Sequence, residues 1–439
     1  MVQPNTDNQE GNGETAPSVY RSILIVGGGM AGISAAVEAA EAGYEVVIVE
    51  KEAFLGGRVA QLNKYFPKLC PPACGLEINF QRIKKNPRIR FFTLAEVEKI
   101  SGQPGNFDVT IRQRARYVND RCTACNACVA VCPVDRPDTF NFGMSKTKAI
   151  YLPHAMAFPM KYVIDDSACE LNACAKCVEV CKYDAIDLDM KSKSFNLKVG
   201  ALIMATGWNP YDATRIDNLG FGRYADVITN MMMERLAAPN GPTKGKIVRP
   251  SDGKPVNSVV FVQCAGQRDE THLGYCSAIC CLGSLKQATY VREQNPDSRA
   301  YIFYIDLRTP GTYEFFSRKV QSDRNVSVMK GKVAKIIEDP TSKELIVEAE
   351  DILSAQKFRV KADLVVLAAG MVASVEERKP TGPLGYDRDH FVVPDETAPG
   401  IYAAGCARGP MDVANSVQDA TAAALMAIQA IHSAAERRV

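Results

Sequence analysis

Two regular runs of cysteines constrain this 439-residue chain more than any other feature of its sequence. The first run has the spacing C-x2-C-x2-C-x3-C-P, and the second has C-x4-C-x2-C-x3-C. Such a pair of runs is typical of a chain that binds two 4Fe-4S clusters, in which three cysteines of a run bind one cluster and the fourth crosses to the other. The predicted ligand sets are Cys122, Cys125, Cys128 and Cys181 for one cluster, and Cys132, Cys169, Cys174 and Cys177 for the other.

Zinc binding and structural disulfides are the two simpler explanations of these runs. Zinc ribbons use pairs of C-x2-C motifs at other separations, and disulfides are disfavoured in a reducing cytosol. The second run departs from the usual ferredoxin spacing in its longer first gap, and Lys182 stands where the first run has Pro133. Cys169 is therefore the ligand with the weakest support, and an incomplete second cluster stays open.

Length and composition point to an ordinary globular protein of about three domains. The chain is 46% hydrophobic and carries a formal net charge of only +2, so nucleic acid is not an expected partner. We see no apolar run of the ~18 residues that would span a bilayer. The first 18 residues are polar and lack the hydrophobic core of a signal peptide, so we expect a cytoplasmic protein with a disordered start.

A glycine-rich turn between a strand and a helix predicts a dinucleotide site. An apolar run at residues 22–26 is followed by the turn and then by an alanine-rich amphipathic stretch. The glycines of the turn are Gly27, Gly29 and Gly32. They allow a tight bend and a close approach of a pyrophosphate to the helix N-terminus. The next predicted strand, 45–49, is followed by Glu50, an acid able to accept hydrogen bonds from a ribose.

Two further glycine elements favour FAD over NAD at this site. Gly56, Gly57 and Arg58 resemble the second glycine signature of flavoproteins with two dinucleotide-binding domains. Residues 202–207, which include Thr206 and Gly207, and residues 364–370 resemble the segments at which the chain of these flavoproteins crosses between domains.

The C-terminal part adds a predicted helix whose dipole would face the flavin. Gly405 and Cys406 precede this helix, which is expected at about residues 412–432. Most flavoproteins of this kind carry an Asp directly after the glycine. Cys406 departs from that pattern and leaves the usual ribityl contact open.

A third group of cysteines stands where a second dinucleotide site would be expected. A predicted strand at residues 258–262 leads into Gln267 and Arg268 instead of a glycine fingerprint. The cysteines of this region are Cys264, Cys276, Cys280 and Cys281. Clustered intracellular cysteines more often bind metal than stay unligated, so the sequence predicts a third 4Fe-4S cluster. Four unligated thiols buried in a core are the alternative.

Together these motifs resemble the flavoprotein component of heterodisulfide reductase, its A-type subunit, over residues 21–439. The compact form, without the extra cluster-bearing regions usual in that component, and residues 68–77 resemble most the A-type subunits of quinone-interacting membrane-bound oxidoreductase complexes. The resemblance implies an α/β fold with two dinucleotide-binding domains, similar to thioredoxin reductase, and an inserted α+β ferredoxin domain with two clusters.

We expect six segments along the chain. They are a disordered N-terminus (1–18), the first part of the FAD-binding domain (19–116), the inserted ferredoxin-like domain (117–189), a second FAD-binding part with a connection (190–256), a degenerate NAD-binding-like domain with the third cysteine group (257–362) and a C-terminal FAD-binding part (363–439).

The resemblance implies an oxidoreductase subunit that is active in a complex. It would relay electrons between menaquinol and adenylylsulfate reductase in dissimilatory sulfur metabolism. Its partners would be a second flavin and iron-sulfur subunit of the same type, a membrane subunit that binds quinone, and soluble adenylylsulfate reductase. Through these partners the cytoplasmic chain would associate peripherally with a membrane.

Three alternatives remain. One is a heterodisulfide-reductase flavoprotein of the A type that splits the two electrons of a flavin between two acceptors. Another is an NAD(P)H-dependent disulfide reductase that uses Cys70 and Cys74 as redox thiols, which the missing second fingerprint disfavours. The last is a cofactor-free scaffold. In the leading interpretation no residue acts as a nucleophile, and Arg58 and the helix near Asp412 stabilise the reduced flavin by charge and dipole.

Overall fold

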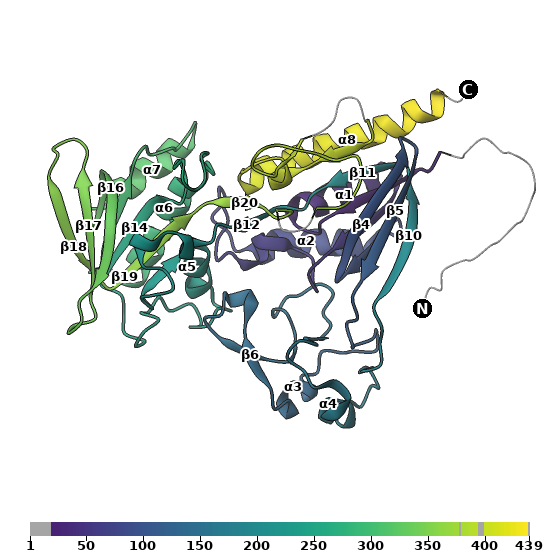
Figure 1. Cartoon of the computed structure of the whole chain (residues 1–439), viewed down its shortest axis with the longest axis horizontal. Coiled ribbons are helices and arrows are strands. Elements are labelled where there is room, and N and C mark those ends of the chain that lie inside the picture. The colour runs from purple at the N-terminus through teal and green to yellow at the C-terminus, as the bar shows by residue number, and fades with distance from the viewer. Residues whose placement is uncertain (1–18, 377–378, 394–398, 438–439) are drawn as a thin grey trace, which may run out of the picture.

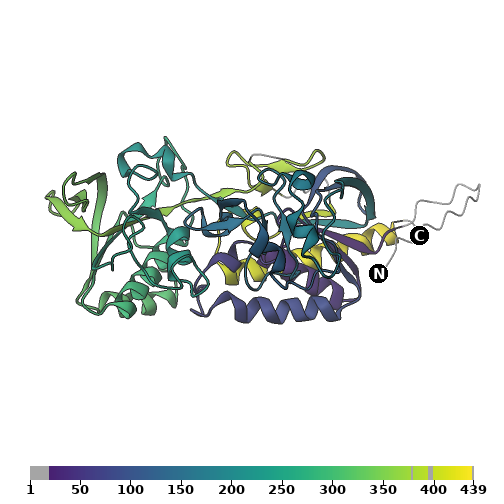
Figure 2. The same cartoon turned by 90° about the horizontal axis from the view of Figure 1, so that it is seen from below.

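The computed structural model describes residues 19–376, 379–393 and 399–437 (Figure 1). The predicted disordered segment 1–18 lies outside this range. The molecule is elongated, with an α/β unit at each end of its long axis and a smaller unit below them that carries α3, α4 and β6. The view from below shows how thin the molecule is across this axis (Figure 2). No helix among the described residues is long and apolar enough to cross a membrane.

The first α/β unit is built on a five-stranded parallel sheet in the order β23-β11-β1-β2-β3. Its strands are β1 (Ser22–Val26), β2 (Glu45–Glu50), β3 (Ile89–Thr93), β11 (Ala201–Met204) and β23 (Ile401–Ala403). Continuous apolar runs such as β1 suit a sheet that is buried on both faces. The helices of this unit are α1 (Met30–Glu41), α2 (Pro72–Lys85) and α8 (Val413–Glu436). Alanines of α1 and α8 pack together over one face, and α8 extends one turn beyond its predicted end because Ala434 is still buried there.

The opposite face of this sheet is covered by three antiparallel strands in the order β10-β5-β4. They are β4 (Ala95–Gln103), β5 (Asn106–Gln113) and β10 (Lys193–Val199). Gln113 at the end of β5 lies opposite Lys193 at the start of β10. The chain between them therefore leaves and rejoins the unit at one point, so the cysteine-rich segment is an insertion into this sheet.

The inserted segment consists of short elements around a small core that contains most of its cysteines. Its elements are α3 (Ala127–Val131), β6 (Asp135–Pro137), β7 (Lys146–Lys148), β8 (Ile150–Tyr151), β9 (Val163–Ile164) and α4 (Lys176–Glu179).

The second α/β unit contains a seven-stranded sheet in the order β13-β19-β14-β15-β16-β17-β18. Its strands are β13 (Val227–Thr229), β14 (Ser258–Ala265), β15 (Arg299–Tyr304), β16 (Val326–Glu338), β17 (Leu345–Asp351), β18 (Lys357–Ala362) and β19 (Leu364–Ala369). Its helices are α5 (Asn230–Ala237), α6 (Cys280–Gln294) and α7 (Tyr313–Gln321). β14 and β15 are parallel neighbours joined through α6, as in a dinucleotide-binding unit.

Two antiparallel strands, β12 (Trp208–Pro210) and β20 (Met371–Ala373), connect the two units. Each directly follows one of the segments in which the sequence predicts a crossing between domains. A second link is Arg235 of α5, which is fully buried. Its guanidinium donates to the Asn141 side chain of the insertion (2.8 Å) and to the Gln61 carbonyl of the first unit (3.3 Å). One side chain therefore joins all three parts of the molecule.

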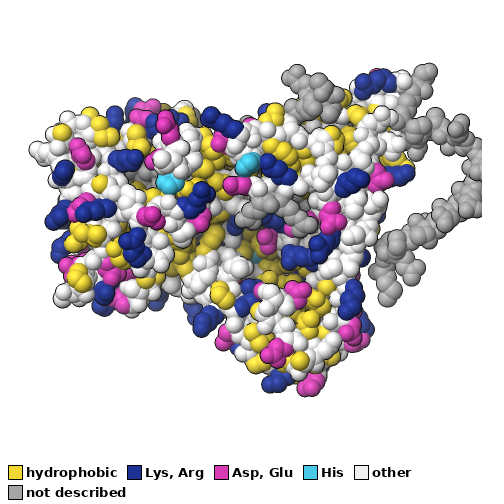
Figure 3. Space-filling model, in the orientation of Figure 1, with side chains coloured by type: hydrophobic (Ala, Val, Ile, Leu, Met, Phe, Trp, Pro, Cys, Tyr) yellow, Lys and Arg dark blue, Asp and Glu magenta, His cyan; other side chains and the backbone are white. Residues whose placement is uncertain are grey.

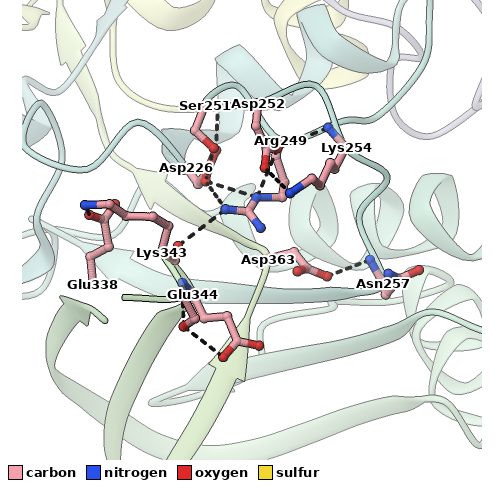
Figure 4. Close-up of polar contacts among 11 residues, drawn as sticks. Asp226, Arg249, Ser251, Asp252, Lys254, Asn257, Glu338, Lys343, Glu344 and Asp363 are labelled. Carbon is pink, nitrogen blue, oxygen red and sulfur yellow. Dashed lines mark hydrogen bonds and ion pairs between the residues drawn. The ribbon is translucent and has the colours of Figure 1, made fainter. Parts of the chain in front are cut away.

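A polar cluster fixes the connection that precedes β14 (Figure 4). Asp226 accepts hydrogen bonds from the backbone and hydroxyl of Ser251 (2.9 and 2.6 Å) and pairs with Arg249 at 3.2 Å. Asp363 accepts from the backbone N–H of Asn257 at 2.8 Å. These residues hold loops on the second unit and are structural. Elsewhere on the face seen in Figure 1, acidic and basic side chains are interspersed, in agreement with the small net charge (Figure 3).

Candidate flavin and iron-sulfur sites

The glycine turn after β1 is shaped to receive a phosphate group. A Cβ atom on Gly27 would lie 2.2 Å from the Ala205 carbonyl oxygen, and one on Gly32 would lie 1.9 Å from the Gly27 carbonyl oxygen. These two glycines therefore permit close backbone packing. A Cβ atom on Gly29 would meet no atom nearer than 3.9 Å, because this glycine faces a cavity. Because α1 begins at Met30 without a side-chain cap, its first N–H groups are available to an anion.

Glu50 lies beside this turn at the end of β2. Its carboxylate accepts hydrogen bonds from the backbone N–H groups of Gly28 (2.6 Å) and Glu52 (2.7 Å). Burial raises the pKa of the Glu50 carboxyl to about 7. The carboxyl also lines the cavity, where it can accept a hydrogen bond from a ribose hydroxyl.

The cavity has a volume of about 830 Å³, which is within the range of cofactor sites. Eight of the ten predicted flavin contacts line it, namely Gly27, Gly29, Glu50, Gly57, Arg58, Thr206, Gly207 and Cys406. Gly32 and Gly405 do not line it. They support its wall, since a Cβ on Gly405 would lie 2.7 Å from that of Ala31. The cavity continues into the second unit, where Asn230, Lys286 and Tyr313 form part of its wall.

Two polar groups on the cavity wall are consistent with a bound ligand. The hydroxyl of Thr206 is buried and has no hydrogen-bond partner, which is uncommon for a buried polar atom. Arg58 is oriented by hydrogen bonds to the Asn209 side chain (2.6 Å) and the Gln61 side chain (3.1 Å). Burial lowers the pKa of Arg58, and its guanidinium presents positive charge to the cavity.

The N-terminus of α8 also faces the cavity. Asp412 caps the helix by accepting from the Asn415 N–H at 2.8 Å. Cys406 is buried, and its thiol donates to the Met411 carbonyl at 3.4 Å. The carboxylate that an Asp at the position of Cys406 would have supplied is provided by Asp419 of α8. Asp419 accepts a hydrogen bond from the Gly405 N–H at 2.8 Å and lines the cavity. The sequence interpretation missed Asp419, although its position seven residues after Asp412 places both on one helical face.

Lys286 is a second cavity residue that sequence reasoning missed. Its ammonium group is 6% exposed and lies 3.0 Å from the Glu234 carboxylate, which is 2% exposed. It also donates to the Lys64 carbonyl. A lysine within the apolar start of α6 is the sequence signal that could have indicated it, because buried lysines are usually paired.

The structure brings the first predicted cluster set together. Cys122, Cys125, Cys128 and Cys181 line one small cavity. Burial raises the pKa of Cys128 to about 12, and the neighbouring charges of Cys122 and Cys125 act in the same direction. Cluster binding needs thiolates, so the charge of the irons would have to offset this burial.

Three cysteines of the second predicted set, Cys132, Cys169 and Cys177, pack against the core of the insertion. Burial raises the pKa of Cys177 to about 11, and the charges of Cys169, Cys132 and Cys174 raise it further. Each of these thiols therefore lies within electrostatic reach of Cys177. The backbone N–H of Leu171 donates to the Cys169 sulfur at 3.4 Å, a contact of the kind that tunes cluster potentials.

The third group surrounds the start of α6. Burial and the charges of Cys281 and Cys276 raise the pKa of Cys264 to about 11. Cys280 and Cys281 are the first residues of α6, and Cys280 also lines the large cavity. Gln267 fills the turn that follows β14. Its amide nitrogen lies 2.9 Å from the Ala368 carbonyl and 3.3 Å from the Cys280 sulfur.

All fifteen cysteines are free thiols. Within the described residues, no three His, Cys, Asp or Glu side chains converge closely enough to hold a single metal ion.

Cys70 and Cys74 lie outside the walls of the large cavity. Cys70 is partly buried opposite Tyr65, and Cys74 is exposed in the first turn of α2. The histidines have structural surroundings. For example, His154 stacks on Phe140 at 4.7 Å between ring centres, and burial lowers its pKa to about 4.

Two family models match parts of the chain. The model described as FAD dependent oxidoreductase matches residues 22–69, and the one described as 4Fe-4S binding domain matches residues 115–135. The thioredoxin reductases of T. acidophilum and Lactococcus lactis have similar folds, each with a TM-score of 0.51. They are 16% and 12% identical, and the matches cover 93% and 94% of this chain and 98% and 99% of theirs.

Curated relatives match a far longer part of the chain than the two family models do, and at a higher identity than the two solved structures. The three described here are A-type components of heterodisulfide reductases. The iron-sulfur component of this type from the CoB–CoM heterodisulfide reductase of Methanocaldococcus jannaschii is 42% identical over 92% of this chain and 64% of its own. Its counterpart in the H(2):CoB-CoM heterodisulfide,ferredoxin reductase of Methanothermobacter marburgensis is 36% identical over 93% of this chain and 64% of its own. The counterpart in the ferredoxin:CoB-CoM heterodisulfide reductase of Methanosarcina acetivorans is 36% identical over 96% and 58%.

The chain spans less than two thirds of the length of these relatives. They are named as oxidoreductases. The predicted fold class is confirmed, since the chain matches thioredoxin-reductase-like structures, an FAD oxidoreductase model and a 4Fe-4S model. Over more than nine tenths of its length, the chain is a homologue of the A-type subunits of heterodisulfide reductases.

Proposed function

We propose that this chain is an electron-transfer subunit of the heterodisulfide reductase A type, with one FAD and three 4Fe-4S clusters. The observation that carries the proposal is that one cavity is lined both by eight predicted flavin contacts and by Cys280 of the third cysteine group. When bound, FAD supplies the conversion between two-electron and one-electron chemistry. The cysteines hold acceptors that take electrons singly.

The chain itself would bind and orient the flavin and adjust its electrostatics. The N-terminus of α1 would hold the pyrophosphate, and Glu50 would accept a hydrogen bond from a ribose hydroxyl. Arg58, Lys286 and the N-terminus of α8 place positive charge or dipole around the cavity. Such fixed charges stabilise a reduced, anionic flavin without reorganisation during transfer.

We infer further that the two electrons of the flavin can leave in two directions. The name of the Methanothermobacter marburgensis relative gives two acceptors, heterodisulfide and ferredoxin. In this chain the cavity is bordered by Cys280 on α6 and by Phe140 and Tyr151 of the inserted segment. Tyr151 is the neighbour of Ile150, which lines the small cavity of Cys122, Cys125, Cys128 and Cys181. One cysteine group thus lies on a wall of the large cavity and another lies behind a second wall, so a bound flavin would have two possible electron acceptors.

This interpretation is favoured over the relay between menaquinol and adenylylsulfate reductase that the sequence predicts. The relatives are heterodisulfide reductase subunits, and their names imply further subunits in a complex. Adenylylsulfate reductase, a membrane subunit for quinone and a second flavin and iron-sulfur subunit stay predictions. Identification of the proteins that co-purify with the native chain would distinguish the two partner sets.

Cofactor content tests the proposal directly. Protein purified without oxygen should contain one FAD and about twelve irons per chain, as three clusters require. A reproducible value of about eight irons would remove one of the three clusters. A colourless protein that takes up neither flavin nor iron on reconstitution would exclude the function.

A further inference from the structure

Strand β8 separates the flavin-sized cavity from one of the predicted cluster sites. Ile150 is 1% exposed and lines the small cavity formed by Cys122, Cys125, Cys128 and Cys181. The next residue, Tyr151, lines the large cavity. Successive side chains of a strand point to opposite faces, so a single strand forms the wall between the two sites.

Buried hydrogen bonds hold the two sides of this wall together. Arg116 is 6% exposed and donates to the carbonyl of Tyr162 at 2.9 Å and to the carbonyl of Ala53 at 3.0 Å. Tyr162 lines the cysteine cavity and Ala53 lines the large cavity. The spacing between the two sites is therefore fixed by a rigid, buried contact.

The ring of Tyr151 is itself held in place. The guanidinium carbon of Arg136 lies 3.9 Å from the ring centre, a cation–π contact. Arg136 is buried and pairs with Asp165 at 3.3 Å. The ring is thus held between the large cavity and a cation that belongs to the inserted segment.

None of the eight cysteines of the insertion lines the large cavity itself. The site of the first set shares strand β8 with that cavity, because Ile150 lines the one and Tyr151 lines the other. This shared wall is the observation that favours the site behind β8 as the one nearer to the flavin.

We propose that the cluster held by Cys122, Cys125, Cys128 and Cys181 is the proximal partner of the flavin, and that Tyr151, positioned by Arg136, sets the coupling across β8. This rests on the proposed function. With both groups bound, Tyr151 and Ile150 would lie between them. One electron would leave the reduced flavin, which would be oxidised, and enter the cluster, which would be reduced, with no bond between heavy atoms formed or broken. The second cysteine set would hold the next acceptor.

Paired ligand substitutions test the order of the two clusters. In the complete chain, the bound flavin is excited by a light pulse with EDTA as electron donor, and absorbance records how flavin and clusters re-equilibrate. The rate constant contains transfer in both directions, so it reports coupling whichever centre has the higher potential. Cys125→Ser should abolish the fast phase, whereas Cys174→Ser should leave it unchanged. The reverse pattern would overturn the proposed order.

Substitution of the wall residue tests the role of Tyr151. Tyr151→Leu should slow the fast phase several-fold, because a void replaces packed atoms on the path. Tyr151→Phe, which keeps the ring, should restore the rate. Met160→Ala in the same insertion is the control and should have no effect, since the Met160 side chain is exposed and lines neither cavity. An unchanged rate in Tyr151→Leu, with wild-type flavin and iron content, would overturn this inference alone. Wild-type protein without flavin or iron would overturn the proposed function as well.

Discussion

The ammonium nitrogen of Lys286 lies 3.0 Å from the nearer carboxylate oxygen of Glu234, and both groups are on the wall of the flavin-sized cavity. Glu234 also accepts from the Asn63 N–H at 3.0 Å and from the Gln287 amide at 2.7 Å. Residues from both α/β units therefore orient this carboxylate. The carboxylate in turn holds the lysine charge at the cavity.

Removal of the Lys286 charge should lower the reduction potential of the bound flavin. Lys286→Met removes a positive charge beside the cavity, so a reduced, anionic flavin loses electrostatic stabilisation, and spectroelectrochemistry measures the change in potential. Lys286→Met leaves the Glu234 carboxylate buried and unpaired, which is strongly destabilising, so flavin content is measured beside the potential. Lys286→Arg keeps the charge and is the control. The double variant with Glu234→Gln loses both charges, so its potential should lie closer to the wild-type value. An unchanged potential in Lys286→Met with full flavin content would show that the lysine has only a structural role.

Arg235→Ala should loosen the junction between the three parts of the molecule. The substitution leaves the Asn141 side chain and the Gln61 carbonyl without their donor, at about 1–3 kcal/mol for each buried group. We expect a lower thermal midpoint and faster proteolysis of the inserted segment. Arg223→Ala should change neither, because this exposed arginine contacts only the nearby Asp217 carbonyl and the ring of its neighbour Tyr224 among the described residues. Equal thermal midpoints and equal proteolysis rates in the two variants would contradict the role of Arg235 at the junction.

Cys281→Ser should remove about four irons and leave FAD bound. Cys281 belongs to the third cysteine group and, unlike Cys280, does not line the large cavity. Iron analysis and the flavin spectrum check both halves of the prediction. Cys74→Ser changes an exposed thiol outside the cluster groups and should keep full iron content. Loss of flavin with all irons retained would show that Cys281 is misassigned.

The free energy of unfolding of the flavin-free protein should fall as pH rises, because the buried carboxyl of Glu50 resists ionisation. Burial raises the pKa of this carboxyl from an ordinary 4.5 to about 7, so the folded state keeps a proton that the unfolded chain releases. The free energy of unfolding should therefore fall by about 3 kcal/mol between about pH 4.5 and pH 7, and then level off. Glu50→Gln should lose this dependence, which thermal midpoints across that range would record. If the thermal midpoints of the wild-type protein and of Glu50→Gln fell in parallel with rising pH, Glu50 would not be the source of the pH dependence.

Local sequence patterns were sufficient to predict the glycine-rich turn between β1 and α1. Gly27 and Gly32 sit in a strand–turn–helix context, and their close contacts are with neighbouring backbone, which a short motif can encode. The cysteine spacing likewise predicted which four side chains surround the cavity behind β8. In both cases the chemistry is carried by residues close together in the chain or by fixed ligand spacing.

Contacts between distant segments could not be predicted in the same way. Lys286 meets Glu234 and Arg235 meets Asn141 only because α5, α6 and the insertion pack together. The carboxylate expected at the position of Cys406 is supplied by Asp419, which lies thirteen residues later in the chain, on α8. No single-sequence periodicity encodes such pairings.

The isolated chain should not oxidise NADH or NADPH at a useful rate. A pyrophosphate needs glycines in the turn after the strand, where backbone N–H groups must be approached closely. After β14 that space holds the Gln267 side chain, which accepts from the Ser277 N–H at 2.9 Å and donates to the Ala368 carbonyl. Arg268 is held by Asp306 at 2.7 Å. Anaerobic stopped-flow mixing with each nucleotide should leave the flavin oxidised, while dithionite, as the control, reduces it. Rapid bleaching by either nucleotide would make an NAD(P)H-dependent disulfide reductase the better interpretation.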